Sequence, residues 1–246
     1  MAHIYSPWEL VGGVWIHKGS MGALLARLSF WCQPWCLHPP KTICLVNAYS
    51  LVEAHRNQKH MDTLRGADLC LADGAGVALL AGTSKIAGAD LMIAAAKHPV
   101  LGKMRHVLLG GFGVAYDAAY AQWTQALGVH PAVIRPWKPE KDGDALFMVD
   151  WANSVPCDIL WVALGCPKQE IWMMENRHRL KAKVVIGVGA AFDFLAGRVP
   201  RAPRWMQPIG LEWAWRIYQE KERWRRQVMA ATGFLILGLR SVFRRH

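Results

Sequence analysis

Short apolar runs rich in β-branched residues recur along the chain, and each is followed at once by glycine or a polar residue. Runs of this length are typical of buried strands, and the stretches between them have helical spacing. Strands that alternate with helices predict an α/β fold with a mostly parallel central sheet. The expected strands lie near residues 43–46, 69–72, 105–109, 132–134, 158–164 and 184–188.

The stretches between these runs predict the helices. Residues 1–40 are rich in Trp and Gly and end in two prolines, so we expect a lead-in that contains a helix and closes with a turn. Asp90 is expected to cap a helix rather than to take part in chemistry. The expected helices cover residues 50–60, 77–81, 91–97, 114–127 and the region after residue 211.

Polar side chains follow the first two expected strands. Asn47 comes directly after the first, and Asp73 follows the second, in front of Gly74. Ligands of open parallel sheets bind outside the carboxyl ends of the strands, where a carboxylate can take a proton from a hydroxyl group. Both residues also suit a structural role, Asn47 in an Asx turn or helix cap and Asp73 as an N-cap.

Two later strand ends carry groups suited to an anionic ligand. One ends in Gly110 and Gly111, and a glycine turn before a helix can hold phosphate with backbone N–H groups. After the next, Pro167 suits the first position of a helix. Lys168 and Gln169 would then lie in the first helical turn and face the ligand.

The last expected strand leads into small residues that let the backbone approach a ligand closely. Asp193 follows within Phe-Asp-Phe, where the flanking phenylalanines favour a buried structural carboxylate. Arg198, Arg201 and Arg204 lie beyond it in a loop stiffened by prolines. Guanidinium binds phosphate through a fixed fork of donors, so this loop suits an anionic group.

Four motifs in this chain have the order and spacing of a known family. They read LADGAG, LGCPKQEIW, GVGAAFDFLAG and RAPRWMQPIGLEWAWRIYQE. Together they resemble the signatures of the WecG/TagA/CpsF glycosyltransferases (glycosyltransferase family 26), over a region from about residue 46 to residue 226. The resemblance implies a single Rossmann-like domain and an enzyme that transfers a sugar with inversion of configuration.

The resemblance also implies the substrates and their binding residues. The donor would be a UDP-linked hexose or N-acetylhexosamine, the acceptor a polyprenyl-diphosphate-linked sugar of cell-surface or exopolysaccharide synthesis, with no cofactor and no required metal. Asp73 matches the family's catalytic base. Asn47 matches the second residue of a catalytic Thr-x-Asn pair in which Leu45 replaces Thr. The implied substrate-binding residues are Lys85 (where the family has Arg), Gly110, Gly111, Lys168, Gln169, Glu170, Asp193, Arg201, Arg204, Glu212 and Arg216.

Positive charge gathers at the end of the chain. Of the net charge of +11, the segment from residue 198 to residue 246 carries +8, from ten Arg and one Lys against three Glu. Such a segment implies an anionic partner. Its apolar run, Val228–Leu239, is too short to span a bilayer but suits a helix in the membrane interface or, alternatively, one packed on the domain or a partner.

We therefore expect a catalytic domain over residues 1–200 and a membrane-associating appendage over residues 201–246. The enzyme would be peripheral, at the cytoplasmic face of the plasma membrane. No uncharged apolar run is long enough for a spanning helix, and the N-terminal segment is a poor signal peptide. Contact with the membrane or the acceptor diphosphate is expected from Arg223, Arg225 and Arg226.

Two patterns of potential metal ligands are set aside. Cys32, Cys36 and His38 lack a second ligand pair with zinc-finger spacing. Asp142 and Asp144 form an Asp-x-Asp pattern in a polar, turn-like stretch, where a solvated turn is expected. The six cysteines follow no secretion signal, so we expect reduced thiols and no metal site.

Two other classes of protein are alternatives to a glycosyltransferase. A nicotinamide-dependent oxidoreductase needs G-x-G-x-x-G after the first strand and an acidic residue about twenty positions on, and the chain has neither. A nucleic-acid-binding protein would explain the basic charge, but here the charge is mixed with apolar residues, which favours a membrane surface. The sequence leaves open which sugar moves and whether a homo-oligomer forms.

Overall fold

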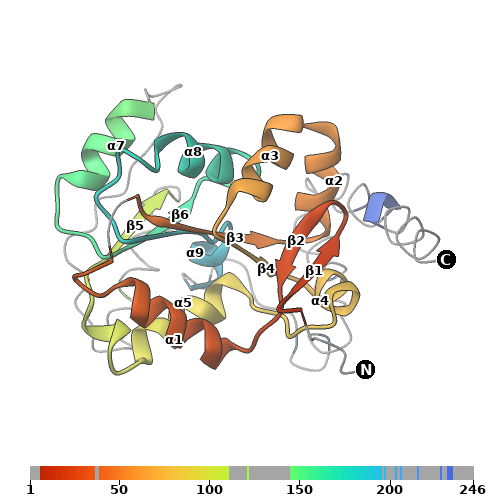
Figure 1. Cartoon of the computed structure of the whole chain (residues 1–246), viewed down its shortest axis with the longest axis horizontal. Coiled ribbons are helices and arrows are strands. Elements are labelled where there is room, and N and C mark those ends of the chain that lie inside the picture. The colour runs from red at the N-terminus through yellow and green to blue at the C-terminus, as the bar shows by residue number, and fades with distance from the viewer. Residues whose placement is uncertain are drawn as a thin grey trace.

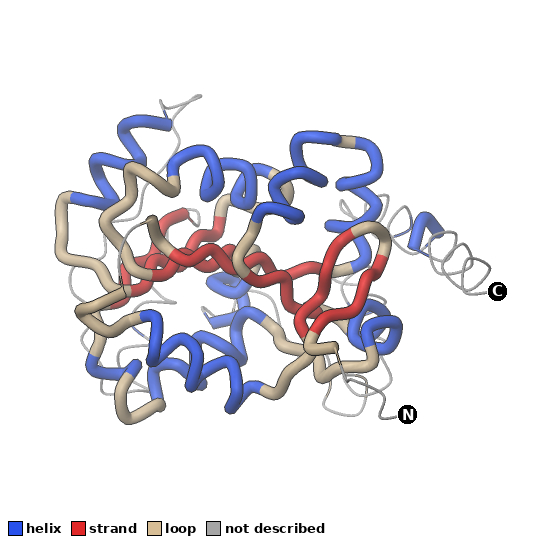
Figure 2. The backbone as a smooth tube through the Cα atoms, in the orientation of Figure 1, coloured by secondary structure: helices blue, strands red, loops and turns tan. Residues whose placement is uncertain are grey.

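The structure is a computed structural model, and it describes residues 6–36, 39–110 and 145–195 of the chain. It also describes the separate positions 121, 197, 203, 206, 215, 228 and 232–234. A sheet lies at the centre of the molecule, with helices on both of its faces (Figures 1 and 2). The predicted α/β class is confirmed.

The central sheet has five strands in the order β4-β3-β7-β6-β5, and all neighbouring strands are parallel. Five of the predicted strands therefore exist, with bounds within two residues of those expected, and the one expected at 132–134 lies outside the described residues. The strands are β3 (Lys41–Val46), β4 (Leu69–Ala72), β5 (His106–Gly110), β6 (Ile159–Ala163) and β7 (Val184–Gly187).

Alternate strand residues face two separate apolar cores. In β3, Ile43 and Leu45 belong to one core, and Cys44 and Val46 belong to the other. The first core is closed by α1 (Met21–Trp31), α5 (Gly88–Lys97), the short 3-10 helix η1 (Leu101–Lys103) and α9 (Ala191–Leu195). The second is closed by α2 (Ala48–Arg56), α3 (Gln58–Gly66), α4 (Ala75–Ala81), α7 (Ala145–Asn153) and α8 (Lys168–Asn176).

The lead-in contains the expected helix, α1, and also a β-hairpin that was not predicted. Strands β1 (Trp8–Val11) and β2 (Val14–His17) pair antiparallel and lie against β4, α3 and α4 (Figure 1). Gly12 and Gly13 connect them with φ values of 55° and 80°. A two-residue loop with positive φ at both positions matches the twist of a hairpin, so Gly-Gly between two short apolar runs was the available signal.

Three helix boundaries differ from the prediction. The helix expected over residues 50–60 is two helices, because Asn57 ends α2 and its side chain caps α3 by accepting from the His60 N–H at 3.2 Å. Asp90 does not cap α5: the helix starts at Gly88, and Ala87 holds the cap position. Pro167 lies at the cap of α8 rather than in its first turn. The helix expected over 114–127 lies outside the described residues.

Ion pairs connect neighbouring segments at the amino ends of the strands. Asp68, just before β4, accepts from Lys41 Nζ at 2.9 Å and Arg177 Nη2 at 3.1 Å. Asp158, just before β6, accepts from Arg105 Nε at 2.8 Å and lies 3.3 Å from Lys183 Nζ. Half-buried Asp68 and buried Asp158 thus hold strands together at this edge, and the opposite, carboxyl edge carries the candidate chemistry.

Candidate active site

The carboxyl ends of β3 and β4 bring Asn47 and Asp73 together. Val46 is paired with Ala72, so the residues that follow them leave the sheet side by side. The Asp73 N–H donates to the Val46 carbonyl at 2.8 Å, and a Cβ on Gly74 would lie 3.8 Å from Asn47 Cβ. Gly74, which has φ of 128°, follows Asp73 and adds no side chain beside it.

The segment that carries Lys85 runs along the same corner of the sheet. The N–H of its neighbour, Ile86, donates to the Ala72 carbonyl at 2.8 Å, so the chain passes directly beside the end of β4. Lys85 and Asp73 are both half-buried there. The predicted base and the predicted phosphate-binding lysine therefore lie in adjoining turns, although twelve positions separate them in sequence.

The sequence left a helix-capping role open for both Asn47 and Asp73, and the structure shows it only for Asn47. Asn47 is the N-cap of α2, with its Oδ1 accepting from the Ser50 N–H at 3.0 Å. At the start of α4 the cap position belongs to Gly74, so Asp73 is not the N-cap. This capping hydrogen bond engages the amide oxygen of Asn47 and holds its side chain at the carboxyl edge. The catalytic roles of both residues stay predictions.

The turn after β6 carries Gln169 and Glu170 into the interior. Gln169 Oε1 accepts from the Gly189 N–H at 3.0 Å, and its Nε2 donates to Glu170 Oε1 at 2.7 Å. Gly187 at the end of β7 makes room for this amide, since a Cβ there would lie 3.0 Å from Gln169 Nε2. Gln169 is only 3% exposed, whereas Lys168 is exposed. Gln169 thus joins the β6–α8 and β7–α9 turns, and Lys168 faces outward.

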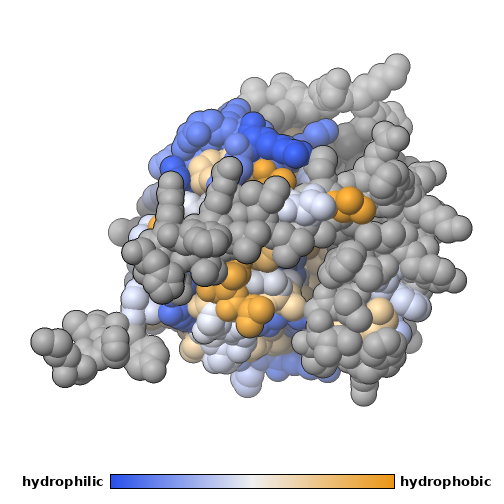
Figure 3. Space-filling view, turned by 90° about the vertical axis from the view of Figure 1, so that its right-hand side faces the viewer, coloured by the Kyte–Doolittle hydropathy of each residue, from blue (hydrophilic) through white to orange (hydrophobic). Residues whose placement is uncertain are grey.

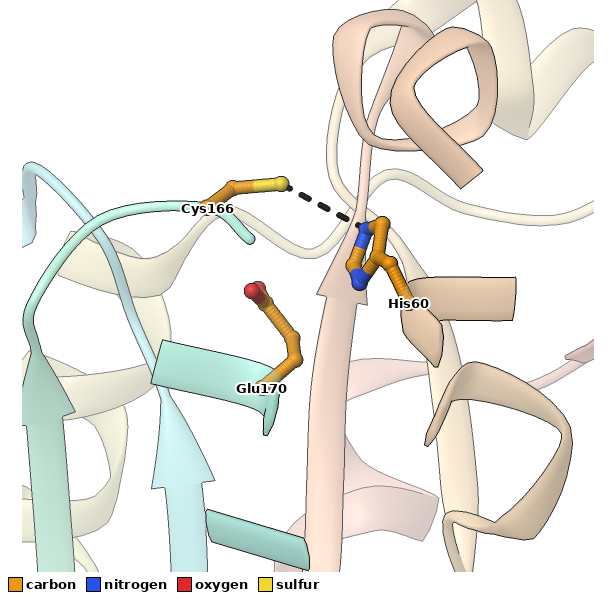
Figure 4. A group of neighbouring side chains, drawn as sticks. All are labelled: His60, Cys166 and Glu170. Atoms are coloured by element: carbon orange, nitrogen blue, oxygen red, sulfur yellow. Dashed lines mark hydrogen bonds between the residues drawn. The ribbon is translucent and has the colours of Figure 1, made fainter. Parts of the chain in front are cut away.

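Next to Glu170, the β6–α8 turn meets helices α2 and α3 in a group of side chains of which the sequence analysis singled out only Glu170. Cys166 Sγ lies 3.6 Å from His60 Nε2 and 3.6 Å from Ser50 Oγ, and Ser50 Oγ lies 3.3 Å from the same imidazole nitrogen. Ligand atoms of His60, Cys166 and Glu170 all lie within 4.8 Å of one another (Figure 4). Burial lowers the pKa of His60 to about 4, so its imidazole is neutral at pH 7.

Ser50 connects the two halves of the edge. Its backbone is bound by Asn47, and its hydroxyl contacts Cys166 in the β6–α8 turn. Contacts therefore run without a break from the Asp73 corner, across α2, to the turn that holds Gln169. His60 and Cys166 had no common signal in the sequence, because 106 positions separate them and the break at Asn57 that turns His60 inward was not expected.

The remaining predicted residues divide into two groups. Gly110 ends β5 with φ of 98°, and a Cβ there would lie 2.6 Å from the Ala163 carbonyl oxygen. Asp193 is half-buried in α9, between buried Phe192 and half-buried Phe194. Outside the described residues lie Gly111, Arg201, Arg204, Glu212, Arg216, Arg223, Arg225 and Arg226, and with them nearly all of the expected appendage.

Two observations bear on the environment in which the site works. The helices in the described ranges are all too short or too polar to cross a membrane. All six cysteines are thiols, as expected. The sequence predicted no metal site, and that prediction is untested, but His60, Cys166 and Glu170 form a group that could hold an ion.

Open parallel α/β sheets bind their ligands outside the carboxyl ends of the strands, which is where Asp73, Asn47 and the turn of Lys85 lie. Residues 9–246 match the model of the glycosyl transferase WecG/TagA/CpsF family. The chain belongs to this family, and it is a glycosyltransferase.

Two relatives share most of their length with this chain. One is the N-acetylglucosaminyldiphosphoundecaprenol N-acetyl-beta-D-mannosaminyltransferase of Bacillus subtilis (strain 168), 28% identical over 197 residues, which cover 76% of this chain and 74% of the relative. The other is the enzyme of the same name from Bacillus spizizenii (strain ATCC 23059 / NRRL B-14472 / W23), 29% identical over 183 residues, which cover 72% and 70%. The resemblance noted in the sequence is thereby confirmed.

Proposed function

We propose that the protein transfers a hexose or N-acetylhexosamine from a UDP-sugar to a polyprenyl-diphosphate-linked sugar, with inversion, in the synthesis of a cell-envelope polymer. The relatives' names support an acceptor of the N-acetylglucosaminyl-diphospho-undecaprenol type and N-acetylmannosamine as the first donor sugar to test. The observation that carries the proposal is the half-buried Asp73 at the end of β4, next to Asn47 and to the turn of Lys85.

In this mechanism Asp73 is the general base. The acceptor hydroxyl gives its proton to the Asp73 carboxylate while its oxygen attacks the anomeric carbon of the donor from the face opposite UDP. The bond from that carbon to the UDP oxygen breaks, and its electron pair leaves with UDP. Attack and departure on opposite faces invert the configuration of the sugar.

The leaving diphosphate needs positive charge and hydrogen-bond donors where its own charge develops. Lys85 is the assigned cation on the Asp73 side, and Gly110 begins the backbone turn assigned to the nucleotide. Asn47 and Gln169 would orient the sugars. Gln169 is itself held by Gly189 and Glu170, so its role would be to fix the shape of the edge as well as to contact a substrate.

The cytoplasmic face of the plasma membrane is the proposed location, because a nucleotide sugar and a lipid-linked acceptor meet there. The +8 segment beyond residue 198 supplies the charge to bind anionic headgroups or the acceptor diphosphate, with Arg223, Arg225 and Arg226 the assigned contacts. Large apolar side chains are also exposed on the side of the molecule shown in Figure 3. There β1, which carries exposed Leu10, contacts α4, which carries exposed Leu79.

The function is tested by offering the purified protein an undecaprenyl-diphosphate-linked N-acetylglucosamine and a panel of UDP-sugars, with the lipid product read by mass. The panel contains N-acetylmannosamine, its uronic acid, N-acetylglucosamine and glucose. The proposal predicts that one donor extends the lipid by the mass of one sugar. Hydrolysis of the donors without lipid extension, or no reaction with any of them, would contradict it.

Transfer is expected to need no added divalent ion, because the proposed base and the proposed leaving-group cation are both side chains. Activity in EDTA should match activity with Mg²⁺ or Mn²⁺. Loss of turnover in EDTA, with recovery on adding either ion, is the contrary result.

A further inference from the structure

We infer that His60, Cys166 and Glu170 form a binding site for one thiophilic divalent metal ion of the zinc type, in which Glu170 is a metal ligand rather than a substrate-binding residue. The three side chains come from α3, the β6–α8 turn and α8, and their ligand atoms lie within 4.8 Å of one another (Figure 4). Catalytic and regulatory zinc sites commonly use three protein ligands and leave a fourth position for water or another group.

The distance between the Cys166 and His60 ligand atoms suits tetrahedral coordination. Zinc–sulfur bonds of 2.3 Å and zinc–nitrogen bonds of 2.0–2.1 Å put two tetrahedral ligands about 3.5 Å apart. Cys166 Sγ and His60 Nε2 are 3.6 Å apart. These two ligands are therefore spaced for one tetrahedral ion, and the proton of the thiol leaves to solvent as the ion binds.

The chemistry of the ligands selects the ion. One thiolate, one imidazole and one carboxylate suit Zn²⁺ or Co²⁺, whereas Mg²⁺ and Ca²⁺ prefer oxygen ligands throughout. Thiolate and carboxylate together carry two negative charges, which a divalent ion balances. Neutral overall charge matters here, because His60 is fully buried and Glu170 is 1% exposed. Cys166 is half-buried and marks the side from which an ion would enter.

Neighbouring groups hold the ligands in place. Gln169 Nε2 donates to Glu170 Oε1 at 2.7 Å, and Gln169 is fixed in turn by the Gly189 N–H. Ser50 Oγ lies 3.3 Å from His60 Nε2 and 3.6 Å from Cys166 Sγ, so it is a candidate for the fourth position. Hydrogen bonds that orient a ligating carboxylate are a common property of metal sites.

The test uses the full-length protein, stripped with a chelator and titrated with Co²⁺, a spectroscopic substitute for zinc. We expect saturation at one equivalent, with the visible bands of tetrahedral Co²⁺ and a near-ultraviolet thiolate-to-cobalt band, both removed by Zn²⁺. Cys166→Ser should abolish the thiolate band and weaken Co²⁺ binding by at least about 100-fold. The matched control, Cys36→Ser, changes a half-buried thiol outside the cluster and should bind as the wild type does.

Two further measurements keep the result independent of folding defects. Glu170→Gln should weaken Co²⁺ binding by a similar factor but keep the thiolate band, since Cys166 remains. Saturating Zn²⁺ should raise the Tm of the wild type by about 5 °C and leave that of Cys166→Ser unchanged. The inference is overturned by an absence of saturable Co²⁺ binding, by equal spectra for wild type and Cys166→Ser, or by loss of the thiolate band in Cys36→Ser instead.

Discussion

Single residues set how closely neighbouring elements approach at the carboxyl edge. Gly110 has φ of 98°, and a Cβ at this position would lie 2.6 Å from the Ala163 carbonyl oxygen. Gly82 also has positive φ, 59°, but a Cβ there would meet nothing within 4 Å. A substitution at Gly82 therefore tests the energetic cost of the backbone conformation alone, whereas a substitution at Gly110 adds the cost of a steric clash.

This comparison yields a stability prediction. Gly110→Ala should lower the free energy of unfolding by about 3 kcal/mol, from backbone strain and overpacking together. Gly82→Ala should lower it by about 1 kcal/mol, from the left-handed conformation alone. Urea unfolding of both variants measures the difference. Equal losses in the two variants would show that the contact with Ala163 contributes nothing.

At this scale the sequence predicted the positions of some residues at the carboxyl edge and not of others. Asn47 and Asp73 were predictable because each directly follows an apolar run, and a run that becomes a strand fixes where its end lies. His60 and Cys166 were not, because their contact depends on how α3 packs against the β6–α8 turn. Asp90 directly precedes the apolar residues of α5 and so suited a cap, but the helix already begins at Gly88 and includes Asp90 in its first turn.

Among the elements, the amino ends of the strands are linked by ion pairs of half-buried Asp68 and buried Asp158. Burial alone raises the pKa of Asp158, but hydrogen bonds and charge from Arg105 outweigh burial and lower the pKa to about 2, from 3.8. A carboxyl group with a lowered pKa in the folded state adds stability above pH 4. That stability is lost as the pH falls from about 4 toward 2.

Asp158→Asn should therefore destabilise the protein by about 2 kcal/mol at pH 7, and the gap from the wild type should narrow as the pH approaches 2. Urea unfolding at several pH values measures it. Asp62→Asn, which changes an exposed carboxylate on α3, serves as the control and should leave no gap at any pH. A gap for Asp158→Asn that stays constant down to pH 2 would refute the ion-pair explanation.

The elements themselves were largely predictable. Buried parallel strands read as continuous apolar runs, so all five strands of the central sheet were predicted. The β1–β2 hairpin was missed because its strands are four residues long and half-exposed. The division between α2 and α3 was missed because Asn57 ends one helix and caps the next, and such a dual role leaves no break in the apolar pattern.

For the whole molecule, the C-terminal segment is expected to join catalysis to the membrane. Two of its described residues lie against the domain. A Cβ added to Gly76 on α4 would lie 2.7 Å from the Phe234 side chain, and a Cβ added to Gly233 would lie 2.7 Å from the Val52 side chain on α2. Removal of residues 221–246 should release the protein from anionic vesicles and lower turnover on a long-chain lipid acceptor. Full vesicle binding by the truncated protein would contradict this.

Anchoring and catalysis by the same segment can be separated. Arg223→Ala, Arg225→Ala and Arg226→Ala, assayed with a short-chain soluble acceptor, should retain turnover if the arginines serve only the membrane. A loss with the soluble acceptor would instead assign the affected arginine to the acceptor diphosphate. Vesicle flotation of the same variants supplies the binding side of the comparison.

The central claim, that Asp73 is the base of a sugar transfer, is tested most directly by the turnover of Asp73→Asn. Asparagine keeps the size and hydrogen bonding of the side chain but removes its basicity, so turnover on the lipid-linked acceptor should fall by about 10² or more, with donor affinity and Tm close to wild type. The matched variant is Asp193→Asn, which changes the rival candidate for the base, the carboxylate that follows the last strand of the sheet. Near-wild-type turnover in Asp73→Asn, together with a folded but inactive Asp193→Asn, would contradict the account and move the base to Asp193.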